Sequence, residues 1–152
     1  MITGFDLVEW QIRVARGEPL PATTFSPRGH AVEARLYAED PAKKFAPQPG
    51  KLARLVWPAA TDDLRIETGF EQGNDITPYY DPLIAKLVAH GPDRASALAR
   101  LDQALAATEL ELVGPRGPAS TNLAYLRQVL ADARFASGQY DTTLAEALAA
   151  GK

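Results

Sequence analysis

The sequence predicts an α+β fold, in which an antiparallel β-sheet is flanked by helices. Apolar residues recur with helical spacing near the N-terminus, alternate from residue 30 onward, and return to helical spacing in the last third. Of the 152 residues, 46% are apolar, enough for one packed core, while 11 glycines and 12 prolines indicate frequent turns rather than a simple helical bundle. We therefore expect one domain over residues 1–152, in which a leading helix and connection (1–28) precede the main body (29–152).

The first predicted helix covers residues 7–16, where apolar side chains recur at i, i+3 and i+7. Thr3 can cap its start, and Gly17 and Pro19 are typical of a helix end. Beyond them, the polar stretch up to residue 28 reads as a connection.

Four strands are predicted in the middle of the chain. In the first, residues 30–38, apolar side chains alternate with Glu33, Arg35 and Tyr37, which places these three on the opposite, polar face. Turn signals at residues 47–50 and 73–75 separate the elements that follow. The other predicted strands cover residues 52–57, 64–68 and 83–89.

The last third is predicted to be helical. Pro92 suits a first helical position, and leucines at 98, 101 and 105 mark one face of the helix that follows. The Gly- and Pro-rich residues 114–118 are predicted to form a loop. A further helix is expected to start at Ser120 or Thr121, and Asp141 to cap a short final helix.

Composition excludes several classes of protein. The absence of cysteine excludes disulfides and thiol chemistry, and a net charge of −3 does not favour nucleic-acid binding. No apolar run approaches the ~18 residues that span a membrane, and no signal-peptide pattern opens the chain. We expect a cytoplasmic protein without nucleic-acid or membrane partners. We expect no metal site either, because His30 and His90 each stand alone.

The polar face of the first strand carries the clearest candidate site. Glu33 and Arg35 lie two residues apart and project from the same face, where the arginine can present a planar fork to a carboxylate-like or phosphate-like ligand. The competing interpretation is a solvated face with a local ion pair worth about 0–1 kcal/mol. Asp81, after two tyrosines, has a simple explanation as a turn residue, and Lys86 within an apolar run more often reaches the surface than acts as a nucleophile.

Five segments resemble the biotin carboxylase family in order and spacing, and together they span nearly the whole chain. They are residues 1–11 (MITGFDLVEWQ), 29–41 (GHAVEARLYAEDP), 45–51 (FAPQPGK), 78–87 (PYYDPLIAKL) and 121–127 (TNLAYLR). The resemblance implies that residues 29–152 form the C-terminal subdomain of such an enzyme. It also implies that the N-terminal and ATP-grasp subdomains precede this sequence in a longer parent protein.

The resemblance implies an ATP-dependent ligase. Enzymes of this family use ATP, Mg and bicarbonate to carboxylate biotin held on a carrier domain, and a separate carboxyltransferase passes the carboxyl group to the final acceptor. We expect this chain alone to bind none of these cofactors and to be inactive. The resemblance leans towards urea carboxylase (urea amidolyase), with acyl-CoA carboxylases left open.

Site residues follow from the same resemblance. Arg35 matches the family's catalytic arginine, which contacts bicarbonate and the biotin ureido oxygen, and Asp81 matches an aspartate on the biotin side. Glu33 is expected to orient Arg35. Thr142 aligns with a position beside the adenine pocket.

The expected homodimer of the parent enzyme is weakened by one departure from the family. Arg65 matches a dimer-surface arginine, but Asp62 stands where a relative has an aromatic residue. The segment 114–120 also looks longer than the family's usual connection, so its geometry is not carried over.

Two other interpretations stay open. The chain is a biotinyl or lipoyl carrier-like module if Lys86 is the modified lysine, although the flanking residues Ala85 and Leu87 are not the usual methionines. Alternatively, the chain is a structural packing domain, in which case Arg35 is dispensable.

Overall fold

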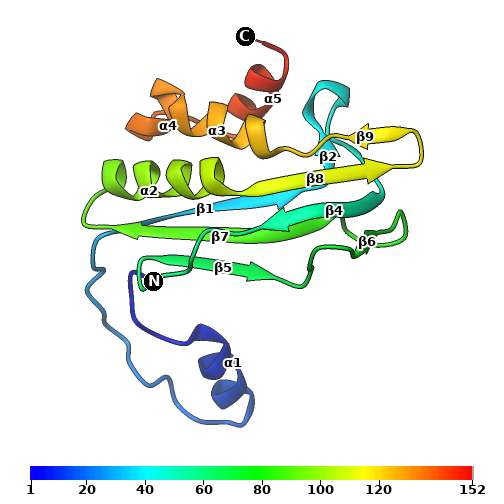
Figure 1. Cartoon of the computed structure of the whole chain (residues 1–152). Coiled ribbons are helices and arrows are strands. Elements are labelled where there is room, and N and C mark those ends of the chain that lie inside the picture. Colours follow the sequence, from blue (N-terminus) through cyan, green and yellow to red (C-terminus); the bar gives the residue numbers. More distant parts are fainter. Residues whose placement is uncertain (152) are drawn as a thin grey trace.

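The computed structural model describes residues 1–151 and confirms the α+β class (Figure 1). The strands form two antiparallel sheets and one short pair. The three-stranded sheet has the order β1 (His30–Tyr37), β7 (Leu83–Gly91), β5 (Leu64–Thr68). The four-stranded sheet has the order β6 (Asp75–Ile76), β4 (Gly50–Val56), β8 (Glu109–Gly114), β9 (Gly117–Ala119). The short pair joins β2 (Glu39–Asp40) to β3 (Ala46–Pro47), with a 3₁₀ turn (Pro41–Lys43) between them.

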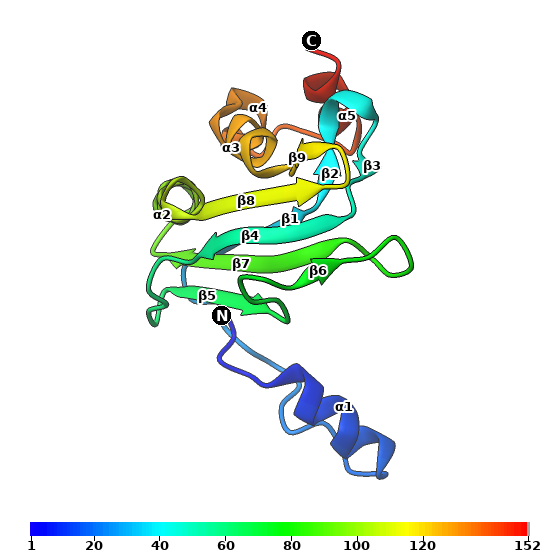
Figure 2. The same ribbon diagram turned by 45° about the vertical axis from the view of Figure 1, so that its right-hand side comes forward.

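The helices lie on two sides of the sheets. Figures 1 and 2 show α1 on one side, at the end of a long connection, and the other helices on the opposite side. Within residues 1–151 no helix has the length and apolarity needed to cross a membrane. The helices are α1 (Leu7–Ala15), α2 (Arg94–Ala107), α3 (Leu123–Ala131), α4 (Ala133–Ser137) and α5 (Thr143–Ala149).

The core forms because β1 alternates as the sequence predicts. Val32, Ala34 and Leu36 are buried, while Glu33 and Arg35 are exposed on the other face. The buried face packs against the second sheet and α2, and one continuous apolar cluster joins them. Its largest fully buried side chains are Leu36, Leu52, Ile84, Leu87, Leu101 and Leu105. One face of the three-stranded sheet is thereby left for polar side chains.

Asp6, and not Thr3, caps α1. The Asp6 Oδ1 accepts hydrogen bonds from the backbone N–H groups of Val8 (3.0 Å) and Glu9 (2.9 Å). A carboxylate at this position satisfies two N–H groups that have no partner within the helix and also favours the positive end of the helix dipole. Thr3 instead accepts from the N–H of Phe5 in the preceding turn.

The predicted loop at residues 114–118 is a β-hairpin instead. Residues 109–114 form β8, and residues 117–119 form β9, which closes back on β8. Pro118 fits there because β9 is an edge strand, where a missing N–H costs no ladder hydrogen bond. Gly117 adopts a φ of +107°, which only glycine accepts readily, and this permits the tight turn.

Helix boundaries in the last third differ from the prediction in three places. The helix α3 begins at Leu123, after the N-cap residue Asn122, and not at Ser120 or Thr121. Asp93 caps α2 through a 2.8 Å bond from the N–H of Ser96, so Pro92 precedes the cap and is not the first helical residue. Asp132 accepts from the N–H of Arg134 (2.8 Å) and starts the additional helix α4. At α2 and α4 an aspartate side chain decides where the helix begins.

Candidate functional site

The polar face of the three-stranded sheet carries a row of charged side chains across its strands. Arg35 of β1 lies opposite Lys86 of the central strand β7, and Lys86 lies opposite Glu67 of β5. Lys86 Nζ is 2.6 Å from Glu67 Oε2, and Arg65 Nη2 is 2.5 Å from Glu67 Oε1. The hydrogen bond from Lys86, together with the nearby Arg65, lowers the pKa of Glu67. Glu67 therefore stays charged, and it forms ion pairs with Lys86 and Arg65 but not with Arg35.

Tyr37 holds the guanidinium group of Arg35. Arg35 Nε donates to the Tyr37 hydroxyl at 3.1 Å, Nη2 donates to the same oxygen, and the guanidinium carbon lies 5.4 Å from the ring centroid. This bond is the main cause of the raised pKa of Arg35, and the charges of Glu33 and Asp81 add to it. No ion pair within residues 1–151 includes Arg35. Because a guanidinium has five N–H groups, Arg35 keeps donors that can bind an anionic oxygen.

The two expected acidic neighbours of Arg35 act through charge and not through contact. Asp81 is exposed in the loop before β7, where its Oδ1 accepts from the N–H of Leu83 at 2.8 Å, as a turn residue does. The pKa of Glu39 is raised mainly by burial, and the nearby charge of Asp81 raises it further. Glu33 forms no hydrogen bond or ion pair with Arg35, so Tyr37 occupies the orienting place expected of Glu33.

Asn122 fixes the backbone at the position of Arg35. Its side chain is buried, with Oδ1 accepting from the N–H of Tyr37 (2.8 Å) and Nδ2 donating to the carbonyl of Arg35 (3.1 Å). The backbone N–H of Asn122 also donates to the carbonyl of Tyr37 at 3.1 Å. These three bonds tie the start of α3 to the end of β1. Neither Tyr37 nor Asn122 was predicted from the sequence as a partner of Arg35, although the alternation of β1 places Tyr37 on the same face as Arg35.

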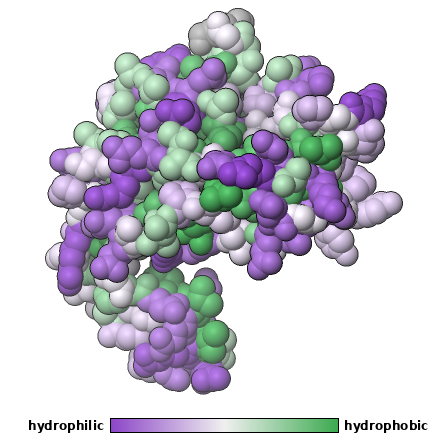
Figure 3. Space-filling view, viewed as in Figure 1, coloured by the Kyte–Doolittle hydropathy of each residue, from purple (hydrophilic) through white to green (hydrophobic). Residues whose placement is uncertain are grey.

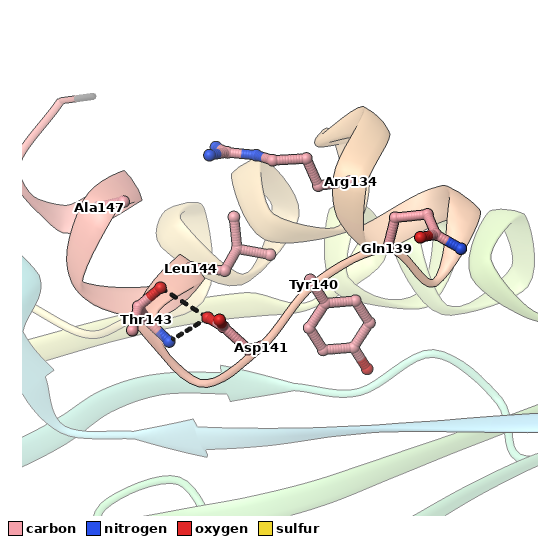
Figure 4. A pocket seen from close by; sticks show the side chains of 7 residues that line it. All are labelled: Arg134, Gln139, Tyr140, Asp141, Thr143, Leu144 and Ala147. Carbon is pink, nitrogen blue, oxygen red and sulfur yellow. Dashed lines mark hydrogen bonds between the residues drawn. The ribbon is translucent and has the colours of Figure 1, made fainter.

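Thr142 belongs to a second region, at the start of α5. A pocket of about 420 Å³ opens here (Figure 4), and Arg134, Gln139, Tyr140, Asp141, Thr143, Leu144 and Ala147 line it. Asp141 Oδ1 accepts from the N–H and the hydroxyl of Thr143 (2.9 and 2.6 Å) and so supports the start of α5, but the N-cap position expected of Asp141 is occupied by Thr142. Thr142 is the N-cap residue between these two, but it does not itself line the pocket. Neither Arg35 nor Asp81 reaches this pocket.

The position of Lys86 argues against the carrier-module interpretation. A modified lysine must stand free at the tip of a turn, where a second active site can reach it. Lys86 instead lies within the central strand of the sheet, half-exposed and paired with Glu67. The geometry therefore favours a structural or electrostatic role for this lysine.

The α+β domain thus has two candidate site regions, an exposed arginine on the polar face of a sheet and a separate pocket at the C-terminal helices. The family model for the biotin carboxylase C-terminal domain matches residues 33–147, and the chain belongs to this family. The resemblance seen in the sequence is thereby confirmed.

Similar proteins include biotin-dependent carboxylases of several kinds. The methylcrotonoyl-CoA carboxylase subunit alpha, mitochondrial, of Dictyostelium discoideum is 43% identical over 144 residues, covering 93% of this chain and 20% of that protein. The urea amidolyase of Saccharomyces cerevisiae is 39% identical over 146 residues, covering 95% of this chain and 8% of that protein. The biotin carboxylase of Halalkalibacterium halodurans is 40% identical over 143 residues, covering 93% of this chain and 30% of that protein.

Solved structures show the same fold. The biotin carboxylase domain of a thermophilic 2-oxoglutarate carboxylase bound to bicarbonate superposes with a TM-score of 0.85 at 37% identity, over 97% of this chain and 32% of that one. A urea carboxylase from Kluyveromyces lactis superposes with a TM-score of 0.80 at 36% identity, over 94% of this chain and 12% of that one. The chain thus spans about a third or less of the proteins that it matches.

Proposed function

We propose that this chain supplies Arg35 to the site in which a biotin carboxylase carboxylates carrier-bound biotin. The observation that carries this proposal is the guanidinium of Arg35, which Tyr37 orients and no carboxylate neutralises. On the same face of this sheet, Arg65 of β5 forms an ion pair with Glu67, so Arg35 differs from it in having no carboxylate partner within residues 1–151. A cation held without a carboxylate partner is suited to receive one from a ligand.

Arg35 would act by stabilising negative charge. When a ureido nitrogen of biotin loses its proton, charge moves to the ureido oxygen, and a donor already fixed at that oxygen lowers the barrier. The bonds that Tyr37 and Asn122 form with this end of β1 provide such pre-organisation. We assign Asp81 to the biotin side of the site, where its charge adds to the field at Arg35.

ATP would be bound at the other region. We assign Thr142 to the adenine side, and the adjoining pocket, with apolar Leu144 and the ring of Tyr140, has the mixed lining that a nucleobase requires. Within residues 1–151 no three His, Cys, Asp or Glu side chains are arranged to hold a metal ion. We therefore assign no Mg²⁺ ligand and no metal-dependent step to this chain.

The proposed partners are the remaining parts of the parent carboxylase, and α1 offers one surface for them. Its apolar side chains Leu7, Val8 and Ile12 are 58%, 65% and 50% exposed, and Figure 3 shows apolar groups on this part of the molecule. We propose that the N-terminal and ATP-grasp subdomains cover such surfaces, and that a biotin carrier domain and a carboxyltransferase act with them. Residues 29–152 would then form the subdomain proper.

Two residues of this chain weaken the proposed homodimer contact of the parent enzyme. Asp62 is exposed in the turn before β5, where a dimer contact would have to desolvate its charge. Arg65 is already engaged by Glu67 of its own sheet. We therefore expect this chain alone to be mainly monomeric at micromolar concentration.

The final acceptor and the location of the protein follow from the parent enzyme. Similar proteins include both methylcrotonoyl-CoA carboxylase subunits and a urea amidolyase, so identity does not favour urea over an acyl-CoA. We propose a cytoplasmic location, whereas the names of several similar carboxylases place those proteins in mitochondria.

A fragment-complementation experiment tests this proposal. The chain alone should cleave no ATP in the presence of bicarbonate and biotin, because it contains no phosphate-binding glycine loop. Mixing it with the separately expressed upstream part of the parent should restore biotin-dependent ATP cleavage. Bicarbonate-dependent ATP cleavage by the pure chain alone would contradict the assignment, and so would full activity of the upstream part without it.

A further inference from the structure

His90 stands between two groups that can only accept hydrogen bonds. Its Nδ1 is 3.0 Å from Asp63 Oδ1, and its Nε2 is 2.9 Å from the backbone carbonyl oxygen of Arg28. A neutral imidazole has one N–H and one acceptor nitrogen, so it can satisfy only one of these partners. The protonated ring has two N–H groups and satisfies both. The geometry therefore selects the imidazolium form.

The bonds of His90 join parts of the chain that are far apart in sequence. His90 lies in β7, Asp63 in the turn before β5, and Arg28 at the end of the connection that leads from α1. Arg28 is itself held to the N-terminal segment, because its N–H donates to the carbonyl of Ile2 at 2.8 Å. Both chain segments that flank α1 are thus linked to the sheet through one imidazole ring.

Other charges around the ring come from α2 and from the chain start. Arg100 of α2 donates to the backbone carbonyl of His90, and its Nη1 is 3.3 Å from Asp63 Oδ2. The amino group of Met1 acts against protonation of His90. The other histidine, His30 of β1, is not in this cluster: its Nε2 is 3.1 Å from Arg94 Nη1 and accepts that hydrogen bond.

The connection passes so close to the ring that only glycine fits beside it. Gly29 adopts a φ of +65°, and a Cβ there would lie 2.7 Å from His90 Nε2 and 2.3 Å from the carbonyl oxygen of Gly91. The backbone of the connection is thereby packed directly against the ring of His90.

We propose that His90 is a proton-controlled clasp, which holds the connection of α1 against the sheet when the ring is protonated and releases the Arg28 carbonyl when it is not. The hydrogen bond to Arg28 and then that to Asp63 raise the pKa of His90 above 6.5. Stability from the clasp is therefore complete below pH 6.5 and is lost as the pH rises through the raised value. The remaining proton stays on Nδ1, because the charged carboxylate of Asp63 is the stronger acceptor. The lone pair of Nε2 then faces the Arg28 carbonyl, and this bond is the one that breaks.

Nuclear magnetic resonance tests the first half of the proposal on the chain as it stands. The sequence has two histidines, so the variant His90→Gln assigns both imidazole ¹⁵N signal sets. Between about pH 5.5 and 8.5, His90 should titrate above 6.5 with both nitrogens protonated at the acid end. Asp63→Asn should lower this midpoint. A His90 midpoint at or below 6.5 would overturn the proposal.

Fluorescence anisotropy of Trp10 tests the second half, because Trp10 lies in α1 and a Trp57→Phe background leaves it as the only tryptophan. Anisotropy should fall as the pH rises through the His90 midpoint, as α1 gains freedom relative to the sheet. His90→Gln should abolish this dependence, while the matched control His30→Gln should keep it. Circular dichroism identifies variants that remain folded. Anisotropy that does not change with pH, or that changes equally in His90→Gln, would refute the clasp.

Discussion

Replacing Asn122 by alanine should destabilise the fold far more than an average polar substitution. The side chain is only 6% exposed, and its loss leaves the N–H of Tyr37 and the carbonyl of Arg35 without their present partners. Each buried polar group left without a hydrogen-bond partner costs about 1–3 kcal/mol. Because a water molecule that enters the space of the lost side chain offsets part of this cost, we expect a destabilisation of about 2–4 kcal/mol in total. For a domain of this size, at about 2–4 °C per kcal/mol, that corresponds to a fall in melting temperature of about 4–16 °C.

Urea unfolding followed by tryptophan fluorescence measures this change. Thr121→Ala is the matched control, because its hydroxyl makes only a 3.5 Å contact with the N–H of Leu123, and it should cost less than about 0.5 kcal/mol. Asn122→Asp keeps the acceptor for Tyr37 but places a carboxylate beside the carbonyl of Arg35, so it should not rescue the loss. A cost below about 0.5 kcal/mol for Asn122→Ala would refute the reasoning that this side chain fixes the end of β1.

Three further variants test other parts of the account. Gly29→Ala should destabilise the fold more than Gly4→Ala. Both glycines have positive φ, so each substitution costs about 1–2 kcal/mol, but only at Gly29 does a backbone oxygen lie 2.3 Å from the new Cβ. Equal melting temperatures of the two variants would contradict this. Leu36→Ala should cost about 2–5 kcal/mol in urea unfolding, since Leu36 is fully buried, and a loss under about 1 kcal/mol would place it outside the core. Bonds from Arg134 lower the pKa of Asp132 from 3.8 to about 2, so this contribution to stability is complete above 3.8 and is lost as the pH falls towards 2. The difference in melting temperature between the parent chain and Arg134→Met should shrink over that range, and a constant difference would argue against the ion pair.

The sheet that carries the candidate site could be predicted because its signals are local. The alternation of β1 is set by which side chains avoid water, so the exposure of Arg35 follows from its neighbours in the sequence. The solvated ion pair between Glu33 and Arg35, offered as the competing interpretation, is not formed. Tyr37 lies on the same face and accepts the guanidinium instead. The exposure of Arg35 could be predicted from the sequence, but its hydrogen-bond partner could not.

What could not be predicted depends on contacts between distant residues. Asn122 forms hydrogen bonds with Tyr37 and Arg35, which precede it by 85 and 87 positions in the sequence. No local sequence pattern near Asn122 indicates these partners. The strand β8 was missed although Leu110 and Leu112 alternate with glutamates, because the adjoining Gly- and Pro-rich stretch suggested a loop. Its pairing with β4, some 55 residues earlier, is what stabilises it. At the start of α1 the sequence offers two possible N-cap residues, Thr3 and Asp6, and the structure has Asp6 as the cap.

The most direct test of the central claim is the rate of biotin carboxylation by the parent carboxylase with Arg35 replaced. Arg35→Ala should slow this step about 10²–10³-fold, equivalent to about 2.7–4 kcal/mol, with little change in melting temperature. Arg35→Lys should recover only part of the rate, because an ammonium group cannot reproduce the planar fork. Arg54→Ala is the matched control, and it should leave the rate unchanged. Arg54 is an exposed arginine of β4 that is paired with Glu109 of β8, within the four-stranded sheet, which does not carry Arg35. A rate for Arg35→Ala within about twofold of the parent would show that Arg35 is a structural residue, and would contradict the site proposed here.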